Sequence, residues 1–165
     1  MTIADSILAE VNQEAETTKR VLDCVPADKL AWRPHPKSFS LGQLALHIAV
    51  APGAVAEGAL PDTMEAPFFA QAQPQNLQEI QDAFSAGLQR VKAALNQMDD
   101  ARMNATWTLT RNGKALMSMP RTGFIRSIML NHIYHHRGQL SVYLRLLDVP
   151  LPSIYGPSAD TNPFI

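Results

Sequence analysis

The chain has 165 residues, of which 46% are hydrophobic, and its formal net charge is -1. This length suits one domain with one sizeable core, and the composition is typical of a folded globular protein rather than a disordered one. Dedicated nucleic-acid-binding proteins usually have an excess of Lys and Arg, which is absent from this sequence. We therefore expect a single domain over residues 1–165 that has no nucleic-acid partner.

Helical periodicity begins at the N-terminus. Apolar residues recur at three- and four-residue steps over residues 3–23, which predicts an amphipathic helix. Three prolines in residues 25–40 then predict a loop. Ser40 is a suitable N-cap for a second helix, which begins with "LGQLALHIAVA", and Pro52 should end or kink that helix.

The middle of the chain combines a loop, a long helix and a hairpin. Prolines predict a loop over residues 61–75. Apolar residues at helical spacing over residues 77–98 predict the third helix, and Asn76 and Glu79 have the relative positions of a capping box. Alternation of Thr with apolar residues, followed by Asn112-Gly113, predicts a short β-hairpin over residues 106–117.

A last helix should start near Pro120, which suits a first helical turn, and continue to about residue 147. The remaining tail is rich in proline, and its apolar residues should lie against the body of the protein. Four long amphipathic helices with little strand predict an all-α fold. We expect a four-helix bundle with a short hairpin between its third and fourth helices.

The cellular compartment of the protein can be predicted from its cysteine content and hydropathy. Cys24 is the only cysteine, so no internal disulfide can form, and we interpret it as a small buried residue near a helix end. The N-terminal residues lack the basic start and apolar run of a signal peptide. The most apolar stretch, residues 44–60, contains His47, Pro52 and Glu57, which argues against a membrane span. We expect a cytoplasmic protein without membrane contact.

Three of the five histidines lie within "HIYHH" of the last helix. His132 and His136 are four residues apart and share one helix face, whereas His135 lies about 100° round from His136. An inward stripe from Ile125 to Leu140 passes through His132 and His136 and favours them over His135. A metal site needs a third ligand, for which His47 is the candidate. The alternatives are a core histidine bonded to a backbone carbonyl for His47, and a solvated or outer-sphere role for the pair.

Two stretches resemble the DinB family of the DinB/YfiT-like superfamily. They are "WRPHPKSFSLGQLALHIA", with a single histidine in its helix, and "NHIYHHRGQLSVYLRLLDVPLPSIYGPSAD", which is similar to that family's "HxxHHRGQL" signature and proline-rich ending. Asp148 stands where the family often has glycine. The resemblance implies an up-down-down-up four-helix bundle, usually a homodimer. It also implies a divalent metal, commonly nickel or zinc, bound by His47, His132 and His136.

Three imidazoles would leave a bound cation with an open coordination position, which is the form of catalytic rather than structural zinc sites. That position accepts water or a thiolate, and some relatives in the superfamily are thiol-dependent transferases and isomerases. We therefore expect a metal-dependent enzyme that activates a thiol or water, a thiol-dependent S-transferase or a hydrolase acting on a small molecule, with a low-molecular-weight thiol as further cofactor. The alternative is a non-catalytic metal-binding stress-response protein.

Further residues are candidates for supporting the metal ligands or lining a pocket: Gln43, Gln139, Tyr143, Arg137 and Trp32. Each also has a simpler structural interpretation. The glutamines and the tyrosine can fill polar gaps in the core, Arg137 can form an ion pair with one of the chain's acids, and Trp32 can pack under the proline loop. His35, within that loop, is expected to be exposed. No catalytic acid or base stands out near the motifs.

Overall fold

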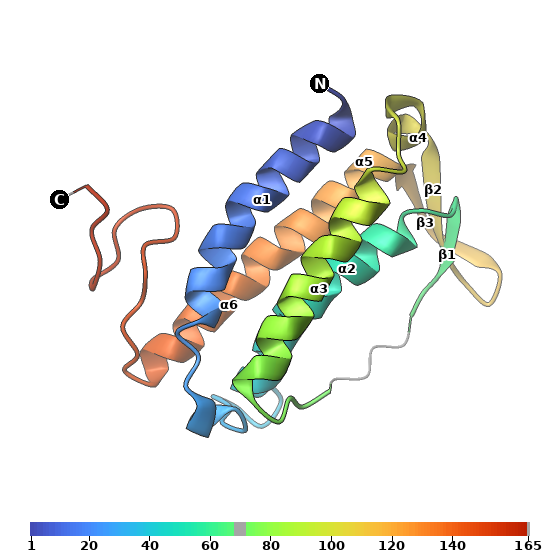
Figure 1. Cartoon of the computed structure of the whole chain (residues 1–165). Coiled ribbons are helices and arrows are strands. Elements are labelled where there is room, and N and C mark those ends of the chain that lie inside the picture. The colour runs from blue at the N-terminus through green and yellow to red at the C-terminus, as the bar shows by residue number, and fades with distance from the viewer. Residues whose placement is uncertain (68–71, 165) are drawn as a thin grey trace.

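The computed structural model describes residues 1–67 and 72–164 and is mostly helical (Figure 1). Its long helices are α1 (Ile3–Leu22), α2 (Leu41–Gly58), α3 (Leu77–Leu95) and α6 (Asn131–Leu146). In Figure 1, α1 and α6 run downward from the top of the view, whereas α2 and α3 run upward. The shorter elements are η1 (Ala27–Lys29), β1 (Thr63–Glu65), α4 (Asp100–Asn104), β2 (Thr106–Arg111), β3 (Lys114–Pro120), α5 (Arg121–Phe124) and the π-helix η2 (Ile125–Leu130).

Side-chain caps explain where the first three long helices begin. Thr2 and Ser40 each accept a hydrogen bond from the backbone three residues later, in full capping boxes with Asp5 and Gln43. Asn76 caps α3 through the Glu79 N–H, but the Glu79 carboxylate accepts from the Gln75 N–H, so the predicted box is incomplete. The predicted starts of α1, α2 and α3 are confirmed.

Pro52 does not end α2, which continues to Gly58. Proline removes one backbone hydrogen bond from a helix, but here Pro52, Gly53 and Ala56 are buried and α2 packs extensively against α3. The two helices approach closely at Gly87, where an added Cβ would collide with the Ala49 carbonyl oxygen. Tertiary packing thus outweighs the local cost of the proline, which the sequence pattern alone could not show.

A three-stranded sheet, ordered β1-β2-β3, makes the all-α prediction correct only in part. The predicted hairpin is β2–β3, and its turn residues Asn112 and Gly113 have φ of 51° and 73°, as a two-residue hairpin turn requires. β1 falls in the segment predicted as a loop, of which residues 68–71 lie outside the described residues. It pairs in parallel with β2, a contact too distant in sequence for local patterns to reveal.

The last helical segment is continuous, as predicted, but it is not uniform. α5, the π-helix η2 and α6 follow one another without a gap, and Pro120 precedes α5 as its N-cap rather than lying in its first turn. π-Helical turns occur often near functional sites, and η2 ends at Leu130, two residues before His132 on α6. α3 likewise ends at Leu95, before the predicted residue 98, and the short helix α4 follows.

Two buried clusters form the core. The sheet-side core joins the ends of α2 and α3 to the sheet, where Trp107 stacks on Phe124 at 3.7 Å between ring centroids and its indole N–H donates to the Gly58 carbonyl. The loop-side core surrounds the start of α2 and the end of α6. On the last helical segment the sheet-side core ends at Leu130 and the loop-side core begins at Leu140. His132 and His136 therefore lie between the two cores.

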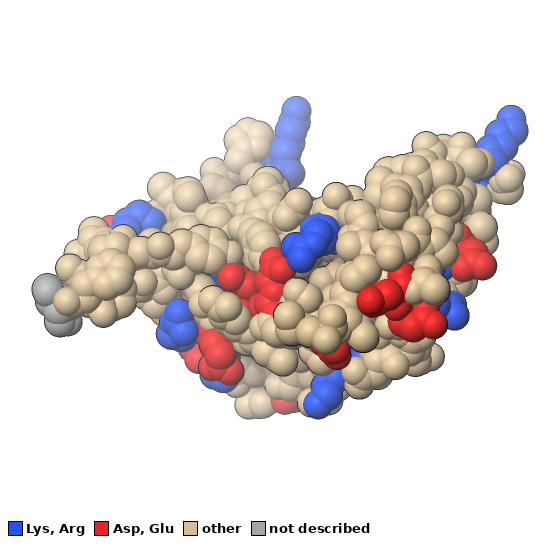
Figure 2. Space-filling model, turned by 90° about the horizontal axis from the view of Figure 1, so that it is seen from above, with Lys and Arg blue, Asp and Glu red and all other residues tan. Residues whose placement is uncertain are grey.

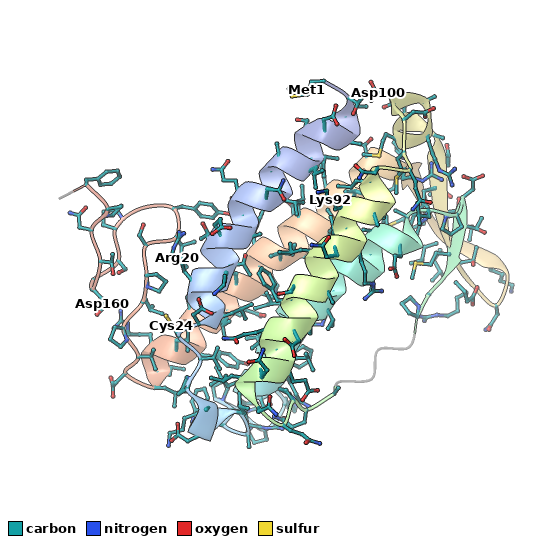
Figure 3. The ribbon with its side chains drawn as sticks, in the orientation of Figure 1. Met1, Arg20, Cys24, Lys92, Asp100 and Asp160 are labelled. Atoms are coloured by element: carbon teal, nitrogen blue, oxygen red, sulfur yellow. The ribbon has the colours of Figure 1, made fainter. Side chains whose placement is uncertain are left out.

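The C-terminal segment lies beside α1 and α6, and Figure 3 marks Asp160 on it. Asp160 accepts from Arg145 and from the Leu151 N–H, and Leu151 and Ile154 pack on the loop-side core as predicted. Phe164 is exposed, contrary to the prediction that it packs. Cys24 is half-buried rather than buried, and burial raises the pKa of its thiol.

The surface carries both signs of charge. Figure 2 shows Lys and Arg side chains interspersed with Asp and Glu on the face seen from above. Over residues 1–67 and 72–164, no helix has the length and apolar character needed to cross a bilayer.

Candidate metal centre

Three histidines converge where α2 packs against α6. His47 comes from α2, and His132 and His136 come from successive turns of α6. One ring nitrogen from each lies within 4.8 Å of the others. The Nε2 atom of His132 is 3.4 Å from that of His47 and 2.8 Å from that of His136. The predicted convergence of these three side chains is confirmed.

The spacing of these nitrogens fits a small cation. Two imidazole nitrogens at about 2.1 Å from a tetrahedral zinc ion are about 3.4 Å apart, from bond length and tetrahedral geometry. The His47–His132 separation has this value, and the His132–His136 separation is shorter by an amount that a small ring rotation restores. The residues present therefore fit a three-histidine cation site.

The other two histidines lie elsewhere. His135 is exposed on α6, about 100° round the helix from His136, as predicted from the apolar stripe. His35 is exposed in the proline loop, where its Nδ1 accepts from the Lys37 N–H. Neither belongs to the converging group.

Burial keeps the three converging imidazoles neutral. It lowers the pKa of His47 to about 4, with further contributions from the charges that His136 and His132 would carry. The pKa of His132 is also lowered, first by burial and then by His136 and His135. Burial lowers the pKa of His136 too, although the hydrogen bond with Gln139 opposes the effect. At neutral pH all three rings therefore offer lone pairs, the form that binds metal.

Gln139 orients one of these rings. Its Oε1 lies 2.7 Å from His136 Nδ1. Because an amide oxygen only accepts, this contact assigns the proton to Nδ1 and leaves the Nε2 lone pair directed at the other histidines. Outer-sphere partners of this kind commonly hold metal-binding histidines in the correct tautomer. This position matches the supporting role predicted as one alternative for Gln139.

The remaining predicted candidates have structural contacts. Gln43 completes the capping box of α2 by accepting from the Ser40 N–H. Trp32 and Tyr143 pack edge to face at 5.7 Å between centroids, within the loop-side core. Arg137 is buried in an ion pair with Glu14. The ion pair of Arg137 and the packing of Trp32 correspond to the simpler interpretations of these two side chains.

Phe39 is a neighbour of the site that sequence reasoning missed. Its ring lies 6.4 Å from His136 in a near-parallel stack and 5.8 Å from His47 edge-on, measured between centroids. The available signal was its place directly before the Ser40 N-cap, where a hydrophobic residue often packs back on its own helix. That signal predicts burial but cannot identify the histidines as neighbours.

A pocket of about 390 Å³ adjoins His47 and His132. We call it the sheet-side pocket, because the sheet forms one of its walls. It was not predicted, since one of its contributing strands, β1, was not predicted. Its described lining consists of His47, Ala51, Ala54, Val55, Met64, Ala66, Pro67, Leu109, Arg111, Met117, Phe124, Ile128 and His132.

Comparisons with known proteins identify the family and the fold of the chain. Residues 10–140 match a family model described as DinB superfamily. The uncharacterized protein YrdA of Bacillus subtilis (strain 168) is 27% identical over 161 residues, covering 94% of this chain and 90% of that protein. A DinB-like protein from Bacillus cereus ATCC 10987 superposes with a TM-score of 0.73 at 25% identity, covering 92% of this chain and 97% of that one. The DinB-like protein YjoA of Bacillus subtilis has a similar fold, with a TM-score of 0.70 at 18% identity over 90% of this chain and 96% of its own.

Proposed function

The chain belongs to the DinB superfamily, and from this premise we propose that it is a metal-dependent enzyme with a divalent cation bound by His47, His132 and His136. Its scaffold in this proposal is an up-down-down-up four-helix bundle that carries the small sheet. The convergence of three neutral ring nitrogens within 4.8 Å is the observation that supports it most strongly. Imidazole ligands suit nickel and zinc, which are the metals we propose.

The surroundings of the triad favour catalysis over a purely structural cation. Structural zinc sites have four protein ligands, whereas the converging group contains three. The sheet-side pocket adjoins two of the three histidines, so a small molecule can reach them. A non-catalytic metal-binding protein needs no such pocket, and this alternative is therefore the less favoured one.

The proposed chemistry is activation of a thiol or of water. A bound cation of this kind supplies Lewis acidity and lowers the pKa of water or a thiol at its open position. Among the described residues that line the pocket, none is an acid that could serve as a general base. The residues of the chain then have positioning roles: Gln139 fixes the His136 tautomer, and Phe39 stacks on His136 and meets His47 edge-on. The reaction classes that fit are thiol-dependent S-transfer and hydrolysis.

X-ray absorption at the metal edge tests the ligand set and the thiol together. Nickel- or zinc-loaded protein should show imidazole scattering from three ligands plus a light-atom neighbour. Addition of a low-molecular-weight thiol should replace that neighbour with sulfur if the protein is an S-transferase, and leave it unchanged if it is a hydrolase. A four-ligand protein shell that neither water nor thiol enters would overturn the catalytic proposal.

We also propose a homodimer, on the basis of the family resemblance alone. Light scattering at micromolar concentration should give twice the mass of the 18.1 kDa chain. A monomer mass at that concentration would contradict the proposal.

A further inference from the structure

The sheet-side pocket has the size and the lining of a small-molecule site. Its volume of about 390 Å³ falls within the usual range for such sites, and apolar side chains form most of its described lining. The apolar walls come from three parts of the fold that are distant in sequence. α2 contributes Val55, the sheet contributes Met64 and Leu109, and the last helical segment contributes Ile128.

The pocket meets the histidine cluster on one side only. His47 and His132 belong to its lining, whereas His136 does not. Phe39, which is not among the described lining residues, stacks on His136 and meets His47 edge-on. A molecule in the pocket would therefore lie next to His47 and His132, and its reacting end would face these two rings.

The charge among the described lining residues of the pocket is positive. Arg111, at the end of β2, is the one Lys or Arg among the described lining residues, and no Asp or Glu is present among them. Arg111 forms no ion pair with any residue in the described ranges. The nearby acid on β1, Glu65, accepts hydrogen bonds from the Thr110 hydroxyl and the Asn112 N–H, and these bonds lower the pKa of its carboxyl more than the charge of Arg111 does. The guanidinium is thus available to a ligand anion.

We propose that the sheet-side pocket binds substrates with an apolar body and one anionic group, the anion pairing with Arg111 and the reacting end facing His47 and His132. The orientation of the reacting end rests on the proposed metal-dependent function, whereas the preference for apolar anions rests on the pocket itself. A cationic ligand of the same shape would be repelled by Arg111 and would find no acid among the described lining residues, so it should bind more weakly.

Three probes with the same eight-carbon chain test the charge preference: octanoate, octan-1-ol and octylamine. Binding to metal-free protein, measured by calorimetry, should be tightest for octanoate and weakest for octylamine. The absence of metal matters, because a carboxylate can also bind a cation directly. Equal or tighter binding of octylamine would overturn the proposal.

Two pairs of variants locate the binding. Arg111→Gln should weaken octanoate about threefold to fivefold, the range for an exposed ion pair, and leave octan-1-ol unchanged. Lys114→Gln removes the same charge from the residue opposite Arg111 on the hairpin, outside the pocket lining, and should have no effect. Ala54→Phe, which fills the pocket from an exposed position on α2, should abolish binding of both probes. Ala93→Phe, at an exposed position of α3, is its control.

The outcomes separate this inference from the proposed function. Equal weakening of octanoate by Arg111→Gln and Lys114→Gln, or unchanged binding in Ala54→Phe, would overturn the pocket assignment. Metal titration of the same preparations tests the triad independently. Metal binding without octanoate binding would overturn the pocket alone, whereas octanoate binding without metal binding would overturn the proposed function and leave the apolar-anion preference supported.

Discussion

Neighbouring residues on α6 show two different ways to place a polar group inside a helical protein. Arg137 is 1% exposed, and its guanidinium donates to Thr18 and Tyr155 and pairs with Glu14 at 2.7 Å. The adjacent His136 has a different environment, in which its Nε2 faces His132 and the pKa of each is lowered. The charge of Arg137 is neutralised by its ion pair with Glu14. The histidine cluster instead brings three ring nitrogens together, and no acid belongs to that group among the described residues.

This difference distinguishes a side chain that stabilises the fold from side chains that are available to bind a cation. A buried charge that is fully paired stabilises the fold only while its partners remain, because each partner would otherwise be buried alone. Three neutral imidazoles carry no charge to balance, so the fold tolerates them, and their lone pairs remain available for a cation. Substitutions in the two regions should therefore affect different measurements.

The largest effect is expected when Arg137 is replaced. Arg137→Met should lower the free energy of unfolding by about 3–5 kcal/mol, because Glu14 loses its buried partner. Urea denaturation of the metal-free protein measures this. Arg145→Met, which removes the exposed ion pair with Asp160, is the matched control and should cost less than about 1 kcal/mol. Equal costs for the two variants would show that Arg137 is not a structural anchor.

Removal of a histidine from the cluster should lower metal affinity strongly and change the free energy of unfolding only a little. His136→Ala should weaken nickel or zinc binding more than about 100-fold, beyond the loss expected for an outer-sphere partner, while changing unfolding far less than Arg137→Met does. His135→Ala, one position earlier and exposed, should keep the affinity of the parent protein. Metal titration against a competing chelator checks both variants, and the reverse order would mean that His135 is the ligand.

Variants of Gln139 test whether the orientation of the His136 ring affects metal affinity. Gln139→Leu should weaken metal binding about tenfold, because His136 loses the acceptor that fixes its tautomer. Gln139→Glu restores an acceptor at the same position and should recover the affinity, since a carboxylate makes the ring a stronger ligand. Similar losses in both variants would assign Gln139 to packing rather than to orientation.

The smallest effect concerns protons released on metal binding. Histidines of unperturbed pKa near 6.5 would be mostly protonated at pH 5.5, and binding would release close to three protons, about 2.7 in total. Here the pKa of His47 is lowered to about 4 and those of His132 and His136 are also lowered, so fewer than about two protons should be released. Affinity then declines at lower pH than it would for unperturbed histidines, as the pH falls toward the folded-state pKa values. Calorimetry in buffers of different ionisation enthalpy counts these protons, and a release near three would refute the burial effect.

Local patterns were sufficient for much of the fold. Periodic apolar residues and capping side chains at Ser40 and Asn76 located the long helices, because these signals act within a few residues along the chain. The Asn112-Gly113 turn located the hairpin for the same reason. The continuation of α2 through Pro52 and the pairing of β1 with β2 depend on partners remote in sequence. Of the two outcomes expected at Pro52, the helix end does not occur, and three residues of the predicted loop, Thr63–Glu65, form a strand.

The sequence by itself determined which histidines share a face, because the four-residue spacing of His132 and His136 and the stripe ending at Leu140 are properties of one helix. It also carried the motifs by which the chain resembles its family. Only the tertiary structure decided that His47 meets that pair, that Gln139 bonds to the His136 ring, and that Phe39 packs on His136 while Arg111 shares a pocket with His47. The physical reason is that packing between α2, α6 and the sheet sets these distances, and no periodicity within a single element encodes them.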